Sequence, residues 1–207
     1  MMRAVLSSLT VSVCTTLLLA GCGSDTPAGG DVDDTAPAGT EASAAEAETV
    51  ELRDPEGAAV GSVTLTEAGA GTQVTAEFTE LPPGFHGFHV HAIGVCEADS
   101  QSPTDPSMTG DFLSAGGHLG AGESEHGQHV GDLPSLFVSP SGEGQLTVVT
   151  DAFAVADLMD DDGSAFMVHA GRDNFANIPE RYAPDGPDEM TRNTGDAGGR
   201  IACGVLP

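Results

Sequence analysis

The sequence predicts an all-β fold, an antiparallel sandwich or barrel, and three observations support this prediction. Short runs that alternate apolar and polar residues follow one another along most of the chain. Turn signals rich in Gly and Pro separate these runs, for example at 54–57 and 82–84. No long stretch shows a convincing helical period, and we expect only a short helical turn within 152–159. Many short strands joined by such turns are typical of sandwiches and barrels.

Eight segments have the composition and alternation of strands, in which successive side chains point to opposite faces. They are 50–52, 60–65, 74–78, 85–91, 135–138, 145–149, 165–169 and 201–206. Two connections, 94–133 and 171–199, are far longer than hairpin turns. Long excursions from a compact β-domain are usually functional. Each begins next to a histidine-bearing strand, so we expect the chemistry where these strands enter the loops.

The first 21 residues are predicted to be a lipoprotein signal peptide. Arg3 precedes an apolar run, 5–20, that is too short to span a bilayer comfortably. The run ends in Leu19-Ala20-Gly21-Cys22, which resembles the lipobox of bacterial lipoproteins. An ordinary cleaved signal, with Cys22 incidental, is the alternative. We expect an exported protein that a lipid on Cys22 anchors to the outer face of the bacterial cell membrane.

Residues 22–49 are predicted to be a disordered acidic tether, rich in Ala, Gly and Pro. Val32 is the only branched aliphatic residue between 23 and 49, so this segment cannot bury enough apolar area to offset its ordering. The remainder, 50–207, is large enough for one domain with a single core. Within it lie two cysteines, Cys96 and Cys203, and in an exported protein these predict one disulfide.

Charge excludes one class of function. The chain contains 32 acidic residues against six basic ones, and its formal net charge is −26. Nucleic-acid recognition needs a basic face, so we expect no nucleic-acid partner. The acidity is most simply a solubility feature.

The most informative segment is Phe85-His86-Gly87-Phe88-His89-Val90-His91. Strand alternation sends Phe88 and Val90 to one face and the last two histidines to the other. A rigid pair of imidazoles suits copper, zinc and related metals, although histidines that only form hydrogen bonds in a loop are the simpler alternative. Further candidate ligands, listed in chain order, are His118, His126, His129, Asp132 and His169. Three histidines and one aspartate are an acceptable tetrahedral zinc set.

These residues carry a family resemblance. The chain resembles bacterial Cu,Zn superoxide dismutases over nearly all of 50–207. The motifs that carry the resemblance are Gly87-Phe88-His89-Val90-His91, Ala115-Gly116-Gly117-His118, His129-Val130-Gly131-Asp132-Leu133-Pro134, His169-Ala170-Gly171 and 195–205.

The resemblance implies the fold and the reaction. The fold would be an eight-stranded antiparallel Greek-key barrel or sandwich, immunoglobulin-like, with two long functional loops. The reaction would convert superoxide to oxygen and hydrogen peroxide through alternate reduction and oxidation of a histidine-bound copper, protecting the cell envelope from extracellular superoxide. Copper and zinc would be the cofactors, one of each per chain. A homodimer is a further arrangement that the resemblance raises.

The resemblance also implies a role for each residue. Copper would be held by His89, His91, His118 and His169. His118 would also take part in catalysis by bridging, as imidazolate, to a zinc held with His126, His129 and Asp132. Asp173 would orient one ligand of each metal, and the pairing of Cys96 with Cys203 matches the family disulfide. Arg200 would receive the superoxide anion beside copper, and His86 would brace a loop without binding metal.

The sequence departs from the family in one respect and leaves two rival functions open. His126 and His129 are only three positions apart, whereas the family usually has a longer zinc subloop there. Weak zinc binding and a copper-only enzyme are therefore alternatives to a zinc site. The chief rival function is a non-catalytic copper-binding or copper-delivery lipoprotein on the same fold. A structural or adhesive sandwich is the second rival, but it would have no reason to gather six imidazoles around two loops.

Overall fold

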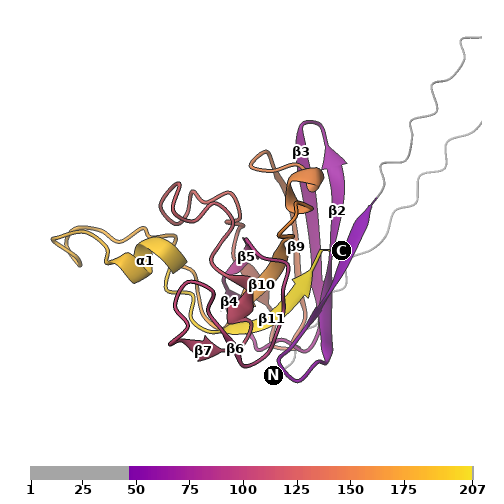
Figure 1. The fold of residues 1–207 in the computed structure, drawn as a ribbon, viewed down its shortest axis with the longest axis horizontal. Helices are drawn as coiled ribbons and strands as arrows, with labels where there is room; N and C mark the ends of the chain where they lie inside the picture. The colour runs from indigo at the N-terminus through magenta and orange to yellow at the C-terminus, as the bar shows by residue number, and fades with distance from the viewer. Residues whose placement is uncertain (1–46, 207) are drawn as a thin grey trace, which may run out of the picture. The chain divides into compact units, whose positions relative to one another are not determined.

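The main element of the protein is one antiparallel sheet that curls into a nearly closed barrel (Figure 1). The computed structural model describes residues 47–206. The order of strands in the sheet is β4-β8-β9-β3-β2-β1-β11-β10-β5. Their bounds are β1 Glu48–Arg53, β2 Ala59–Ala68, β3 Gly71–Phe78, β4 Gly84–His86, β5 Phe88–His91, β8 Leu136–Val138, β9 Gly144–Thr150, β10 Ala165–His169 and β11 Arg200–Val205.

One broken strand closes the barrel. Gly87 alone separates β4 from β5, yet these two strands stand at opposite ends of the sheet order. β4 pairs with β8 while β5 pairs with β10, so this one stretch of chain joins both edges. Counted as one strand, β4 and β5 leave eight strands in the sheet, which confirms the predicted class. The connections β3–β4 and β9–β10 each skip over neighbouring strands, as in a Greek key.

The barrel interior is the core. It is filled by the side chains that point inward, which are alternate residues along the strands. Its largest fully buried members are Phe88, Phe166, Leu52, Leu65 and Leu136. The Phe88 ring packs against the rings of Phe166 and Phe78, with centroids 5.9 and 6.1 Å apart. Close packing of this kind fixes strand β5 from its apolar side. The opposite side of the same strand is therefore presented rigidly to the loops.

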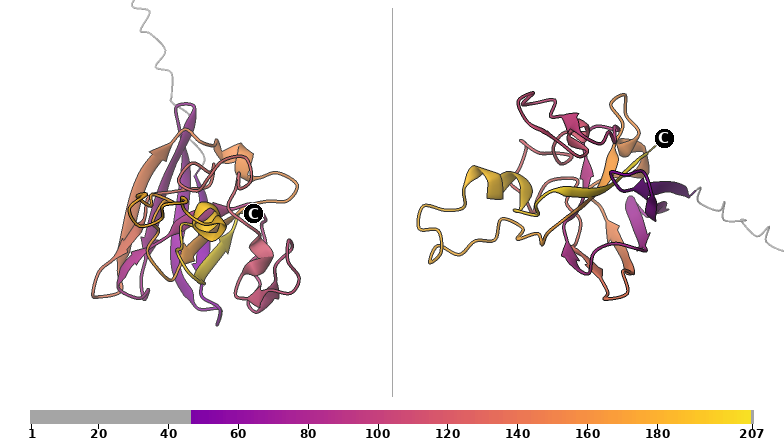
Figure 2. Two further views of the ribbon diagram at one scale, coloured as in Figure 1. Left: turned by 90° about the vertical axis from the view of Figure 1, so that its left-hand side faces the viewer. Right: turned by 90° about the horizontal axis from the view of Figure 1, so that it is seen from below.

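Both long loops contain short elements that the sequence pattern did not predict. The first loop carries a hairpin of β6 (Ser100–Gln101) and β7 (Thr109–Gly110), followed by the 3₁₀ turn η1 (Leu113–Ala115). The second carries helix α1 (Glu189–Thr194), which lies beyond one side of the barrel in two views (Figures 1 and 2). All of these elements are too short to give a recognisable period. The helical turn expected within 152–159 is present as η2 (Val155–Leu158).

The predicted disulfide is confirmed. Cys96 in the first loop is bonded to Cys203 in β11, with the two Cα atoms 5.8 Å apart. Around it, Phe112, Ala115 and Met167 form a small second apolar cluster. The bond and the cluster together fasten the first loop to the outside of the barrel.

The predicted signal peptide, the lipidation site Cys22 and nearly all of the predicted tether lie outside the described residues. Within the described part of the chain, no helix is long and apolar enough to cross a membrane.

Candidate metal centre

Strands β5 and β10 supply three of the predicted ligands. His89 and His91 project from β5 on the side away from the core, as their alternation with Phe88 and Val90 predicts, and both are fully buried. His169 is the last residue of β10, which pairs with β5. Its Nε2 lies 3.4 Å from Nε2 of His91. The pairing of two adjacent strands therefore brings these imidazoles together.

Backbone bridges bring the first loop alongside β5. His118 pairs with His91, and Asp132 pairs with His89, in isolated antiparallel bridges. The amide of Val90 also donates to the carbonyl of Gly131, at 2.8 Å. These contacts place loop ligands beside strand ligands, although the two groups are far apart in the sequence.

Four histidines form the first ligand group. The ligand atoms of His89, His91, His118 and His169 all lie within 4.8 Å of one another, and all four residues are buried. This group coincides with the copper set that the resemblance implies. Imidazole nitrogen is a suitable ligand for copper.

The predicted zinc ligands gather around one carboxylate oxygen, Oδ1 of Asp132. Nδ1 of His118, His126 and His129 lies 3.0, 3.2 and 3.4 Å from it, respectively. Nδ1 of His118 and His129 are 3.5 Å apart. A tetrahedron with zinc–ligand bonds of about 2.0–2.15 Å has edges of about 3.3–3.5 Å. Two of these separations lie in that range, and the two at 3.0 and 3.2 Å are slightly shorter, so the group is close to the size of a zinc site. His89 also lies within 4.8 Å of His118, His126 and Asp132, which shows that the two ligand groups adjoin.

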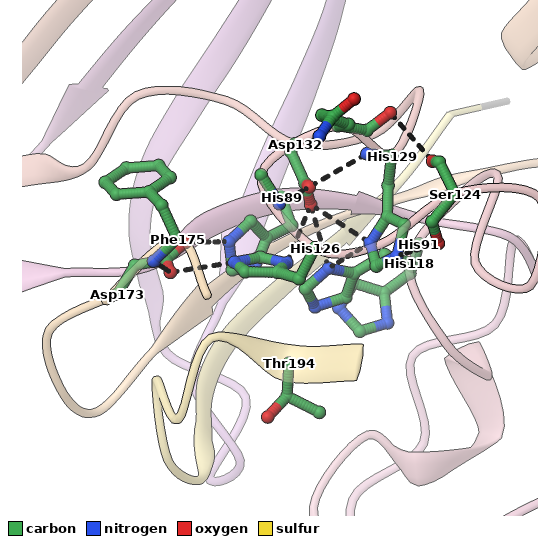
Figure 3. Close-up of polar contacts among 12 residues, drawn as sticks. His89, His91, His118, Ser124, His126, His129, Asp132, Asp173, Phe175 and Thr194 are labelled. Carbon is green, nitrogen blue, oxygen red and sulfur yellow. Dashed lines mark hydrogen bonds and ion pairs between the residues drawn. The ribbon is translucent and has the colours of Figure 1, made fainter. Parts of the chain in front are cut away.

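Asp173 joins the two groups (Figure 3). Nε2 of His89 donates to its Oδ2 at 2.8 Å, and Nε2 of His126 donates to its Oδ1 at 2.7 Å. In its neutral form each imidazole is thereby fixed as the tautomer whose Nδ1 carries a free lone pair. Asp173 thus contacts one histidine of each predicted metal set, as the resemblance implies.

Two buried nitrogens show that metal fits this site. Nδ1 of His89 and Nδ1 of His126 are buried and make no hydrogen bond within the described part of the chain, although Nδ1 of His126 lies 3.2 Å from Oδ1 of Asp132. A buried polar atom without a partner is costly, and such atoms point to a role other than packing. Both nitrogens face the ligand groups and carry lone pairs, so a bound metal ion would satisfy them.

A cleft of about 850 Å³ leads to the first ligand group. His118, His169 and Arg200 contribute to its wall, with residues of the first loop and of α1. The register of β10 and β11 pairs His169 with Arg200, which explains why this arginine stands beside the histidines. Two carbonyl groups of the first loop hold the guanidinium: Nη1 donates to Phe112 at 2.5 Å and Nη2 to Gly116 at 2.6 Å.

Comparison with known proteins gives the family. The model of the copper/zinc superoxide dismutase family matches residues 59–206. The chain belongs to this family.

Curated relatives agree. A Cu-Zn superoxide dismutase of Mycolicibacterium paratuberculosis is 45% identical over 192 residues, which cover 89% of this chain and 82% of the relative. The enzyme of Escherichia coli K12 is 36% identical over 156 residues, 72% of this chain and 80% of the relative. Among solved structures, the Cu/Zn superoxide dismutase of Brucella abortus aligns with a TM-score of 0.61 and 31% identity, over 78% of this chain and all of that one.

Membership in the superoxide dismutase family settles the reaction and the cofactors. The chain is an oxidoreductase that converts superoxide to oxygen and hydrogen peroxide, and it uses copper and zinc. The alternative of a non-catalytic copper carrier is not favoured.

The charge states of the ligands differ between the two groups. Burial lowers the pKa of His91 and His169 well below the usual value, and neighbouring cationic groups add to this. Burial likewise lowers the pKa of His118 to about 4, and it also lowers that of His89. For His126 burial acts in the same direction, but the carboxylates of Asp132 and Asp173 outweigh it and raise the pKa to about 9. The copper set is therefore neutral at pH 7, whereas the metal-free zinc set holds a proton.

Burial also lowers the pKa of Arg200, but only to about 10, so this side chain stays protonated at neutral pH. The other arginines of the second loop make contacts elsewhere. Arg172 lies over the ring of Phe85, Arg181 lies over that of Tyr182, and Nη1 of Arg192 donates to the carbonyl of Pro187. Arg200 is the basic residue in the cleft wall.

His86 is placed as expected for a brace. Its ring nitrogens each lie 2.7 Å from a backbone oxygen, one of Pro82 and one of His169. Three contributors to the site were missed by the sequence analysis: the carbonyls of Phe112 and Gly116, and the ring of Phe175 beside His126. Carbonyl groups have no residue-specific signal in a sequence. The ring is placed by a left-handed backbone that a phenylalanine seldom adopts.

Proposed function

We propose that superoxide is dismutated at a copper held by His89, His91, His118 and His169, beside a zinc held by His118, His126, His129 and Asp132. The observation that carries this assignment is the buried Nδ1 of His89, which makes no hydrogen bond within the described part of the chain, together with the three imidazole nitrogens that gather around Oδ1 of Asp132. When bound, copper supplies alternate one-electron reduction and oxidation. The remaining tasks, to bind the anion, to orient it and to provide a proton, fall to the protein.

Arg200 is proposed to bind the superoxide anion. It is charged, it lies in the cleft wall beside His118 and His169, and two carbonyl groups fix its guanidinium. A preorganised cation at that place orients the anion and stabilises charge without reorganising during the reaction.

His118 is proposed to join the two sets and to carry a proton. Its Nδ1 faces Asp132 and His129, which leaves Nε2 for the copper set. Nε2 can hold a proton and deliver it to the reduced oxygen species in the cleft.

The test uses the purified full chain. Copper and zinc per chain are measured together with superoxide removal, for the wild type, Arg200→Ile and Arg181→Ile. We expect one copper and one zinc in all three proteins. Activity should fall about 10- to 100-fold in Arg200→Ile and stay unchanged in Arg181→Ile. This fall is smaller than the loss expected when a charge-stabilising donor is removed from a site closed to water, because the cleft is open to solvent. Stoichiometric copper without activity would contradict the proposed site, and full activity in Arg200→Ile would contradict the role of that residue.

We also propose that the protein is exported and anchored by a lipid on Cys22. The apolar leader and the lipobox-like Leu19-Ala20-Gly21-Cys22 support this, and the disulfide is compatible with an oxidising location. In cells, the wild type should incorporate labelled palmitate and partition into detergent. Cys22→Ala should do neither; labelling of that variant would contradict the proposed anchor.

A homodimer is a further proposal. Phe85 and Phe137 are partners on β4 and β8, their ring centroids are 5.0 Å apart, and both are about half exposed. A second copy of the chain could cover this pair. Sedimentation of the wild type should show a dimer that Phe137→Asp dissociates, and a monomeric wild type would contradict this proposal.

A further inference from the structure

The second loop encloses the ring of His126. The ring of Phe175 lies nearly parallel to it, at an interplanar angle of 14° with centroids 6.3 Å apart (Figure 3). Gly195 lies against the Nε2 edge: a Cβ atom there would be only 2.3 Å from Nε2 of His126 and 2.0 Å from Oδ1 of Asp173. Only glycine fits between α1 and this pair, so the ring has little freedom to turn.

Phe175 also holds the carboxylate that orients His126. Its backbone N–H donates to Oδ1 of Asp173 at 2.7 Å, and the same oxygen accepts from Nε2 of His126, also at 2.7 Å. Phe175 therefore supports both members of the imidazole–carboxylate pair. Its ring lies beside the imidazole of His126, and its amide donates to the carboxylate of Asp173.

The backbone around His126 is held from the same loop. Its N–H donates to the carbonyl of Arg192 in α1 at 2.7 Å. Nε of Arg192 lies 3.8 Å from Glu125, the preceding residue. On the other side, a Cβ atom on Gly127 would come within 2.8 Å of the carbonyl oxygen of Phe175. The short segment that carries His126 thus packs directly on the second loop.

An unusual backbone conformation accompanies these contacts. Phe175 and Ala176 have φ angles of 54° and 52°, in the left-handed region that non-glycine residues seldom adopt. Strained residues of this kind persist where the surroundings determine them, and they cluster at functional sites. Here the strained turn is what places the ring of Phe175 beside that of His126.

We propose that Phe175 is a positioning residue for zinc. Its ring and its amide fix the plane of His126 through direct contact and through Asp173, so that Nδ1 of His126 points to the zinc position. The inference rests on the proposed function, in which His126 is a zinc ligand.

The test measures zinc affinity and the spectrum of Co²⁺ bound in place of zinc, on the full copper-loaded chain. Phe175→Gly removes the ring and also relieves the positive φ, so a defect in this variant is not a result of added strain. We expect its zinc affinity to fall about 10-fold and its cobalt bands to shift from those of a regular tetrahedral site. Phe175→Tyr, which retains the ring, should restore both properties.

Ala176→Gly is the matched control, because it relieves the same strain one position later and leaves the ring in place. It should bind zinc and cobalt as the wild type does. Wild-type affinity and spectrum in Phe175→Gly would overturn the inference, as would an equal loss in Ala176→Gly. His126→Ala separates the two proposals: if it also keeps full zinc affinity, the proposed ligand set is wrong. If His126→Ala loses zinc and Phe175→Gly does not, only the role of Phe175 fails.

Discussion

At the scale of single residues, the carboxylate of Asp173 is the contact that the two metal sets share. It accepts from His89 and His126, and it is fully buried. Burial alone would raise its pKa, but the contacts with the two histidines outweigh this and lower the pKa below its usual range. The carboxylate is therefore charged at neutral pH and can hold both rings at once.

Asp173→Asn tests this shared contact. The side-chain amide offers one acceptor atom and turns an N–H group toward the other imidazole, so one ring loses its partner. We expect the affinities for both copper and zinc to fall about 10- to 100-fold, as measured by competition with chelators. Asp188→Asn is the control, because Asp188 caps α1 and asparagine caps helices equally well. Unchanged affinities in Asp173→Asn would refute the shared role.

The charge states of the ligands predict how metal binding depends on pH. At pH 7 metal-free His126, with its pKa of about 9, is protonated and must lose this proton to bind zinc. The histidines of the copper set are already neutral, because burial lowers their pKa values. We therefore expect zinc uptake to release about one proton and copper uptake nearly none, when each metal is bound alone.

Calorimetry in buffers of different ionisation enthalpy measures these protons. Between pH 9 and pH 7 the apparent zinc affinity should fall about 10-fold per pH unit, while copper affinity stays nearly constant. Equal proton release for the two metals would contradict the assigned charge states.

At the scale of elements, the two long loops complete the ligand groups to which strands β5 and β10 contribute the first histidines. The first loop is fixed by the disulfide, and its Phe112 carbonyl holds Arg200. The two bonded cysteines are 107 positions apart. For a cross-link that closes a loop of this length, the loss of chain entropy in the unfolded state alone predicts a stabilisation of about 4.7 kcal/mol. We expect Cys96→Ser with Cys203→Ser to lower the free energy of unfolding of the metal-free protein by about 2–5 kcal/mol. An unchanged midpoint in denaturant titrations would contradict this expectation.

Sequence predicted the strands better than the loops. His89 and His91 were placed on one face by alternation alone, because a strand's period of two leaves no other choice once Phe88 and Val90 enter the core. Helix α1 was missed because six residues cannot show a period. The zinc set followed from the resemblance, since nothing in the spacing of His118 and Asp132 shows that a bridge with β5 brings them together.

At the scale of the whole molecule, charge opposes the substrate. The formal net charge of −26 repels an anion at long range, but salt screens interactions beyond about 8 Å at physiological ionic strength. The cleft wall holds Arg200 beside His118 and His169, together with the carboxylates of Asp111 and Asp196. Because Arg200 stands next to the first ligand group, where the anion must arrive, we expect its local attraction to dominate.

Rates measured across ionic strength test this balance. Superoxide removal by the wild type should slow as salt is added, because screening weakens the pull of Arg200. In Arg200→Ile the rate should stay level or rise, since only repulsion is left to screen. A wild-type rate that climbs with salt would show that global repulsion dominates.

Two different metals that occupy adjacent sites and share His118 are the central requirement of the proposed function. Anomalous diffraction at the copper and zinc absorption edges, from crystals of the metal-loaded full chain, tests this directly. We predict one copper bound by His89, His91, His118 and His169, and one zinc bound by His118, His126, His129 and Asp132. An empty second site, or two metals that do not share His118, would contradict the account.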